Sequence, residues 1–177
     1  NFGFIANRAP QVAATLPNLL THVDLPMWID LSDIASDPDG NPLYFRVVEV
    51  TGGTARLTAD GQGLIFTPDA GYAGNATLRV AADDGFGSSA AAGLALNVSN
   101  APLTAIEFEA RDIEFANITE QFRTGLIGTF ADQANVFLPY SYVTTRIGDA
   151  SVATISADGL LRPTGAGSTY LQVTRGS

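Results

Sequence analysis

The chain has 177 residues, of which 46% are hydrophobic and only 15% are charged, values that fit a folded protein of one large or two small domains. Its 18 acidic and 9 basic residues, the latter all Arg, give a net charge of −9, which makes nucleic acid and anionic membrane surfaces poor partners. The lack of Cys excludes disulfides and thiolate chemistry. The sequence contains no run of about 18 apolar residues, the length that a membrane-spanning helix needs.

The first six residues, Asn-Phe-Gly-Phe-Ile-Ala, are apolar and prone to form a β-strand. Because the chain begins at Asn1 without Met or a leader, we expect it to be a processed or excised piece of a longer protein. Residues 1–6 are then either the last strand of a preceding domain or a donor strand that adds to the open edge of a neighbouring subunit.

Apolar side chains mostly recur at every second position, the period of a half-buried β-strand. The alternating sets are Leu43, Phe45 and Val47; Leu64 and Phe66; Leu78 and Val80; Leu171 and Val173. Between them stand turn sequences such as Asp-Pro-Asp-Gly-Asn, Asp-Gly and Gly-Ala-Gly. The pattern predicts an all-β fold of two immunoglobulin-like β-sandwich domains in tandem.

The alternating sets also predict the two cores. For the first domain we expect Ile29, Leu31, Phe45, Val47, Leu57, Phe66, Leu78, Val80, Leu96 and Val98, and for the second Ile106, Phe108, Val152, Ile155, Leu171 and Val173. His22 has no second His and no serine elbow near it, so we expect a surface loop residue rather than a catalytic group.

A domain boundary is expected around residues 99–102, where a strand pattern ends and Asn-Ala-Pro resembles the Asn-Arg-Ala-Pro of residues 7–10. This predicts an N-terminal extension over residues 1–6 and a first sandwich over 7–99. A linker of residues 100–102, stiffened by its Pro, then leads to a second sandwich over 103–177.

The first half resembles the bacterial cadherin-like tandem repeat. The matching segments are Asn7–Pro10, Ile29–Leu31, Ser36–Leu43, Leu64–Pro68, Gly71–Gly74 and Val80–Gly85. The resemblance implies a seven-stranded immunoglobulin-like module that binds calcium between its loops and its linker.

The second half resembles a group 2 bacterial immunoglobulin-like domain. Ser151–Leu161 and Gly165–Val173 carry the match. Thr144–Asp149 stands where that family usually has a Trp-Ser-Ser-like strand end, and residues 112–134 match poorly.

Strands that alternate in direction would bring distant loops to the N-terminal pole of the first domain. The residues gathered there are Asn7, Asp37, Asp39, Asp83 and Asp84. Clustered carboxylates repel one another unless a cation neutralises them, and Ca²⁺ takes such oxygen ligands. The cadherin-like resemblance implies the same ligands through Asp37, Asp39, Asp84 and Asn7. The alternative is that Asp-Pro-Asp-Gly-Asn is only a turn.

We expect a non-enzymatic structural or adhesive module of an exported bacterial surface protein or extracellular fibre, located outside the cell or on its surface and rigidified by calcium. Its partners would be neighbouring domains of the same chain or identical subunits. One alternative is a filament subunit that uses its N-terminal strand. Another is a carbohydrate-binding accessory module of a secreted enzyme, with surface glycan or protein as partner. Trp28, Tyr44 and Tyr72 could form its aromatic platform, although core roles are favoured for them.

Overall fold

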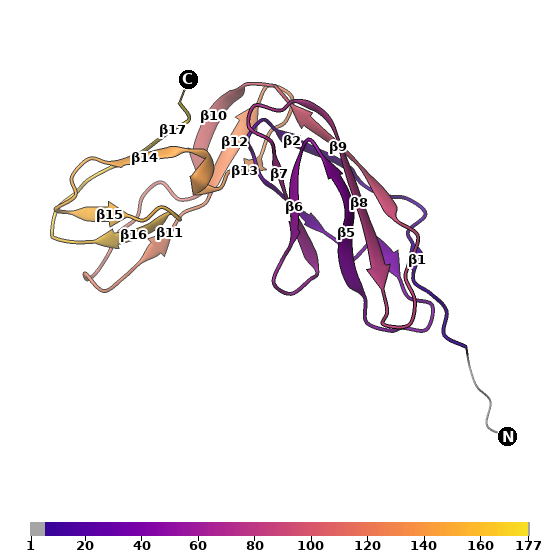
Figure 1. The fold of residues 1–177 in the computed structure, drawn as a ribbon. Helices are drawn as coiled ribbons and strands as arrows, with labels where there is room; N and C mark the ends of the chain where they lie inside the picture. Colours follow the sequence, from indigo (N-terminus) through magenta and orange to yellow (C-terminus); the bar gives the residue numbers. More distant parts are fainter. Residues whose placement is uncertain (1–5, 177) are drawn as a thin grey trace. The chain divides into compact units, whose positions relative to one another are not determined.

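The computed structural model describes residues 6–176 and confirms the all-β class (Figure 1). The one helical segment among these residues is a single 3₁₀ turn, Tyr140–Tyr142, so none of their helices is long and apolar enough to cross a membrane. The chain divides into two compact units, unit 1 up to Asn100 and unit 2 from Ala101 onward. The predicted N-terminal strand lies outside the described residues except for Ala6.

Unit 1 has one four-stranded sheet in the order β2-β9-β8-β5. Its strands are β2 (Asn18–His22), β9 (Ala92–Ser99), β8 (Gly74–Asp83) and β5 (Tyr44–Thr51). The edge strand β2 runs parallel to β9, whereas the β9–β8 and β8–β5 pairs are antiparallel. Figure 1 shows β5, β8 and β9 extended alongside one another.

A second, three-stranded sheet of unit 1 has the order β3-β7-β6, and a short β1-β4 pair flanks the sandwich. The strands are β3 (Met27–Asp30), β7 (Gly63–Pro68), β6 (Gly53–Leu57), β1 (Gln11–Val12) and β4 (Ala35–Ser36). All of these pairs are antiparallel. The two main sheets place their apolar faces against a common core.

The core of unit 1 follows the predicted alternation closely. Eight of the ten expected side chains are buried, and Val47 and Leu57 are half-buried against them. The expectation for His22 was wrong: it is the last residue of β2, and only 1% of its surface is exposed. The prediction failed because His22 lies in a strand, where its partner in the ladder is Ser99, and not in a loop.

A tyrosine ties the end of the β6–β7 hairpin to the start of β8. The Tyr72 hydroxyl donates to the backbone carbonyl of Asn75 at 2.5 Å. Its ring lies so close to Gly52 that a Cβ there would come within 2.7 Å of it, and Gly52 has a φ of +74°. Only glycine satisfies both the backbone conformation and the close approach of the ring.

Unit 2 contains three small antiparallel sheets, β10-β12-β13, β11-β16-β15 and β14-β17. Their strands are β10 (Leu103–Phe108), β11 (Phe122–Arg123), β12 (Leu126–Phe130), β13 (Val136–Phe137), β14 (Thr144–Ile147), β15 (Ala153–Ile155), β16 (Leu160–Pro163) and β17 (Leu171–Thr174).

The core of unit 2 differs from the expectation. The predicted side chains Ile106, Phe108, Val152, Ile155, Leu171 and Val173 do alternate inward, but all are only half-buried. The fully buried apolar residues are instead Leu126, Phe130, Leu138, Tyr142, Ala153 and Leu161. The large buried cluster of the described chain belongs to unit 1 alone. Unit 2 therefore has the alternating strands of a sandwich, but most of its inward-facing apolar side chains are only partly buried.

Candidate functional site

The N-terminal pole of unit 1 is closed by the residues that precede β1. The backbone N–H of Arg8 donates to Asp39 Oδ2 at 2.7 Å, and its guanidinium Nε and Nη2 donate to Asp39 Oδ1 at 3.0 and 2.8 Å. The same Nη2 donates to the carbonyl of Pro38 at 2.6 Å. Arg8 thus binds the loop between β4 and β5 through its main chain and its side chain together. We call this set of contacts the Arg8 clasp.

Asn7 connects the same segment to a second loop. The side-chain Nδ2 of Asn7 donates to Asp84 Oδ2 at 2.8 Å, and its side-chain Oδ1 accepts from Asn41 Nδ2 at 2.7 Å. Asp84 is the first residue after β8, whereas Asn41 precedes β5. Asn7 therefore bridges two loops that are distant in sequence.

The β4–β5 loop is shaped by its own sequence. Asp37 Oδ1 accepts the backbone N–H groups of Asp39 and Asn41, both at 2.9 Å, as an Asx turn requires. Gly40 has a φ of +78°, which a glycine adopts without strain. The predicted turn chemistry is present, and it presents the Asp39 carboxylate to Arg8.

The β8–β9 loop is held by two adjacent aspartates. Asp84 is 5% exposed, and its Oδ1 accepts the N–H groups of Phe86 and Gly87 at 2.8 and 2.6 Å. Asp83 accepts from the Gly85 N–H at 2.8 Å and from the Ser88 hydroxyl at 2.5 Å. Each carboxylate therefore has donors within its own loop.

These donors favour the ionised carboxylates. The pKa of Asp39 lies below its usual value of 3.8, chiefly because of the Arg8 side chain and then of the Arg8 backbone N–H. The pKa of Asp84 is also lowered, first by the Asn7 amide, and that of Asp83 by the Ser88 hydroxyl. In return, Asp39 raises the pKa of Arg8. The pole is a network of charge-assisted hydrogen bonds.

The structure thus brings Asn7, Asp39 and Asp84 to one pole together with the Asp37 turn, whereas Asp83 binds its own hairpin. In this structure the oxygens of Asp39 and Asp84 accept hydrogen bonds from protein donors, and calcium binding by these residues stays a prediction. Within residues 6–176, no group of three or more His, Cys, Asp or Glu side chains is disposed to hold a metal. One feature favours an ion: Asp37 Oδ2 is buried without a hydrogen-bond partner.

Sequence reasoning overlooked Arg8, which supplies the positive charge at this pole. A signal was available, because Arg8 stands next to Asn7 in the segment that was expected to reach an acidic cluster. Several carboxylates that converge need a counter-charge, and a guanidinium can provide it as well as an ion can. The forked geometry of Arg also matches a carboxylate better than Lys would.

The aromatic platform considered as an alternative is not assembled, and the core role favoured for Trp28 and Tyr44 was wrong, because both side chains face outward. Trp28 lies on β3 and is 59% exposed, whereas Tyr44 lies on β5 of the opposite sheet and is 67% exposed. Outward-facing side chains of the two sheets of a sandwich point away from each other. Tyr72 has the core-tying role that was favoured for it.

Comparison with known families decides the relationship of unit 1. Residues 7–97 match the family described as bacterial Ig domain. The chain belongs to the bacterial Ig domain family. The immunoglobulin-like part of the predicted resemblance is thereby confirmed, whereas the cadherin-like assignment and the group 2 assignment of residues 103–177 stay predictions.

Among solved structures, this bacterial Ig chain is similar to surface layer protein SbsC, domains 1-6, with 15% identity and a TM-score of 0.31. It is also similar to the S-layer protein rSbsC(31-844), with 14% identity and a TM-score of 0.32. In both comparisons 99% of this chain is covered but only 26% of the other, so the chain spans about a quarter of their length. Similarity at this level carries no argument about function. None of the curated proteins compared matches the chain.

Proposed function

We propose that the chain is a non-enzymatic structural module of an exported bacterial surface protein or extracellular fibre. In this role unit 1 is a spacer whose N-terminal lead-in is fixed to its pole. Membership of the bacterial Ig domain family supports a structural module. The single observation that carries the proposal is the Arg8 clasp, which binds the lead-in to a loop 31 residues further along the chain.

A spacer domain keeps its neighbours at a fixed orientation only if the chain does not bend where it enters the domain. Arg8 and Asn7 fix the lead-in to two loops, and Ala9 lies against Gly87, where an added Cβ would come within 3.3 Å of the Ala9 Cβ. Pro10, which follows, is buried and has a fixed φ. Four successive residues are thus held, and any segment that precedes them leaves unit 1 in a defined direction.

The test measures the mobility of the lead-in. Backbone ¹⁵N relaxation of the wild type should give order parameters for Asn7, Arg8 and Ala9 close to the value of about 0.85 that is typical of rigid backbone. Arg8→Gln should lower them towards about 0.6 while β8 and β9 remain unchanged. Lead-in order parameters that are low in the wild type, or that do not respond to Arg8→Gln, would contradict the spacer role.

Calcium rigidification, the expectation from sequence, is the competing account of the same pole. Its support is the buried, unpartnered Oδ2 of Asp37. An ion would have to displace the Arg8 guanidinium from Asp39 in order to reach that carboxylate. The two accounts therefore predict different effects of removing Arg8: the clasp predicts a more mobile lead-in, and the calcium account predicts tighter ion binding.

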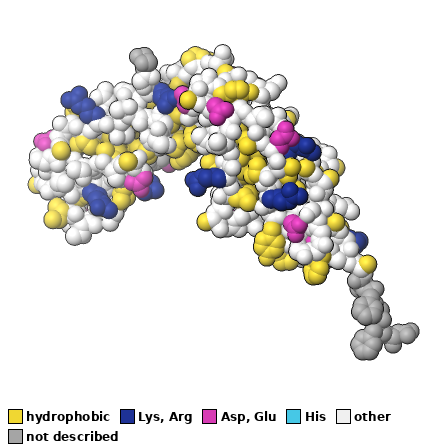
Figure 2. All heavy atoms as spheres, in the orientation of Figure 1, with side chains coloured by type: hydrophobic (Ala, Val, Ile, Leu, Met, Phe, Trp, Pro, Cys, Tyr) yellow, Lys and Arg dark blue, Asp and Glu magenta, His cyan; other side chains and the backbone are white. Residues whose placement is uncertain are grey.

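On the face drawn in Figure 2, acidic and basic side chains are sparse and scattered among neutral ones. Trp28 borders a hollow of about 460 Å³ that Asp30 and Asp33 also line. An aromatic ring beside carboxylates is the observation that favours the carbohydrate-binding alternative, and loss of glycan binding on Trp28→Ala would test it.

A further inference from the structure

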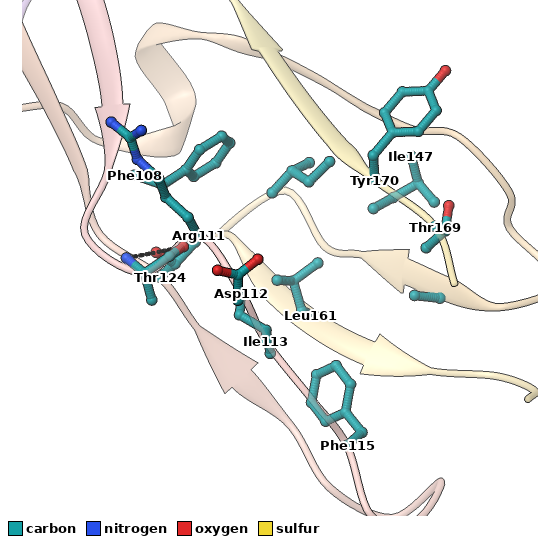
Figure 3. A pocket seen from close by; sticks show the side chains of 13 residues that line it. Phe108, Arg111, Asp112, Ile113, Phe115, Thr124, Ile147, Leu161, Thr169 and Tyr170 are labelled. Atoms are coloured by element: carbon teal, nitrogen blue, oxygen red, sulfur yellow. Dashed lines mark hydrogen bonds between the residues drawn. The ribbon is translucent and has the colours of Figure 1, made fainter. Parts of the chain in front are cut away.

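Unit 2 contains an open hollow of about 370 Å³ inside its incomplete sandwich (Figure 3). Its apolar lining comes from separate segments and includes Phe108, Ile113, Phe115, Ile147, Leu161 and Leu171. Arg111 and Asp112, both exposed, lie at its solvent side. A second hollow of about 500 Å³ adjoins the first and shares Ile113, Phe115, Ala153 and Thr169 with it.

The backbone around the hollow includes segments with unpaired edges. Residues 111–115 form no ladder and make no backbone hydrogen bond to any other part of residues 6–176. Across the hollow, β17 pairs with β14 along one edge only. Of β17, only Leu171 lines the hollow, after Thr169 and Tyr170 that precede the strand. The unpaired backbone of residues 111–115 and the free edge of β17 leave donors and acceptors that an added strand could use.

The apolar side chains around the hollow are only partly buried. Phe108, Ile113, Phe115, Ile147 and Leu171 are all half-buried, although their spacing directs them inward. In unit 1, by contrast, the alternating residues Leu78, Val80, Leu96 and Val98 are at most 3% exposed. Apolar surface left in water in this way favours the addition of a further apolar strand.

We propose that this groove, between the segment from Phe108 to Phe115 and Leu171 at the start of β17, is a strand-acceptor site, and that its occupant is the N-terminal segment of a second copy of the chain, residues 1–6. The proposal is independent of the Arg8 clasp, which concerns unit 1 only.

The sequence of the segment suits the groove. It is uncharged, and its two phenylalanines, Phe2 and Phe4, are two residues apart, so in a strand both face the same side. Their rings can enter the apolar lining, while the backbone of the segment pairs with β17. Ladder hydrogen bonds supply affinity and the alternate side chains supply register, as in other cases of β-strand addition.

We take a second copy as the donor because, within unit 1, the lead-in is bound at the opposite end of β9 from the residue that continues into unit 2. Asn7 is bound to Asp84 beside the start of β9, whereas the chain passes to unit 2 from the end of β9. Six extended residues span at most about 20 Å, less than the roughly 26 Å along β9. Head-to-tail addition of this kind generates an open filament when successive copies do not close into a ring.

The test uses a fluorescent peptide of residues 1–7 and the protein that lacks residues 1–6. We expect saturable binding, and we expect it to be weakened about tenfold or more by Phe4→Asp in the peptide or by Ile113→Asp in the protein. Ile113→Asp should leave unit 2 folded, because residues 111–115 bear no ladder bonds, and circular dichroism checks this. Val48→Asp, on the exposed face of β5, is the matched control and should bind like the parent.

Sedimentation of the full chain then identifies the donor. The wild type should form oligomers as its concentration rises, whereas the truncated protein and Ile113→Asp should remain monomeric. No peptide binding, or equal binding by Ile113→Asp, would overturn the groove as acceptor. Peptide binding together with a wild type that is monomeric at every concentration would place the chain's own segment in the groove and overturn the second copy.

Discussion

Arg8 and Asp39 lie 31 residues apart in sequence, yet the main chain and the side chain of Arg8 both donate to the same carboxylate. The carboxylate carbon of Asp39 should therefore titrate below the usual pKa of 3.8. In Arg8→Gln this midpoint should move upward, because the main source of the shift is lost. Carbon-detected NMR titration measures it, with Asp84, whose pKa is lowered chiefly by Asn7, as the internal control. Equal midpoints for Asp39 in both proteins would contradict the clasp.

Acid should release the lead-in. A carboxyl group whose native pKa is depressed stabilises the fold above its unfolded pKa, and this contribution is lost as pH falls through the native value. Asp39, Asp83 and Asp84 all have lowered pKa values, so unit 1 should lose stability from about pH 4 downward. Thermal unfolding at a series of pH values measures the loss, which should be smaller in Arg8→Gln than in the wild type.

The Tyr72 corner gives a prediction away from the charged pole. Tyr72→Phe should lower the free energy of unfolding of unit 1 by about 1 kcal/mol, since it removes one hydrogen bond to the Asn75 carbonyl. Gly52→Ala should cost more, because it combines a positive φ with a clash against the Tyr72 ring. Urea unfolding measures both, and a neutral Gly52→Ala would show that the ring is not held there.

The two cores should respond differently to truncation. Leu78→Ala removes a side chain that is 0% exposed, and should destabilise unit 1 by about 2–5 kcal/mol. Leu171→Ala should cost unit 2 only about 1 kcal/mol, because that side chain is only partly buried beside an open hollow. Equal losses by urea unfolding would mean that unit 2 is as closed as unit 1.

Period-two alternation predicted the strands well, because burial of one face of a sheet acts on every second residue locally. It could not predict how deeply each side chain is buried. Leu78 and Leu171 stand in equally alternating runs, but only Leu78 is covered by a facing sheet. His22 shows the same limit in reverse, since its burial depends on the neighbouring strand and not on its own hydropathy.

At the pole, sequence reasoning selected residues that do meet, Asn7, Asp39 and Asp84, because the order of strands determines which loops share an end of the sandwich. What neutralises the carboxylates was not predictable, since an ion and a guanidinium solve the same electrostatic problem. The choice depends on where the Arg8 side chain points, and that is set by contacts over long sequence separations.

The most direct test of the central claim, that Arg8 rather than an ion closes the pole, is calorimetry of the wild type and Arg8→Gln in calcium and in excess chelator. The clasp predicts that the two wild-type scans overlay and that Arg8→Gln unfolds at a lower temperature in chelator. A built calcium site would instead raise the unfolding temperature of unit 1 in the wild type by on the order of 10 °C at saturating ion. That shift in the wild type, absent from Asp39→Asn, would contradict the claim.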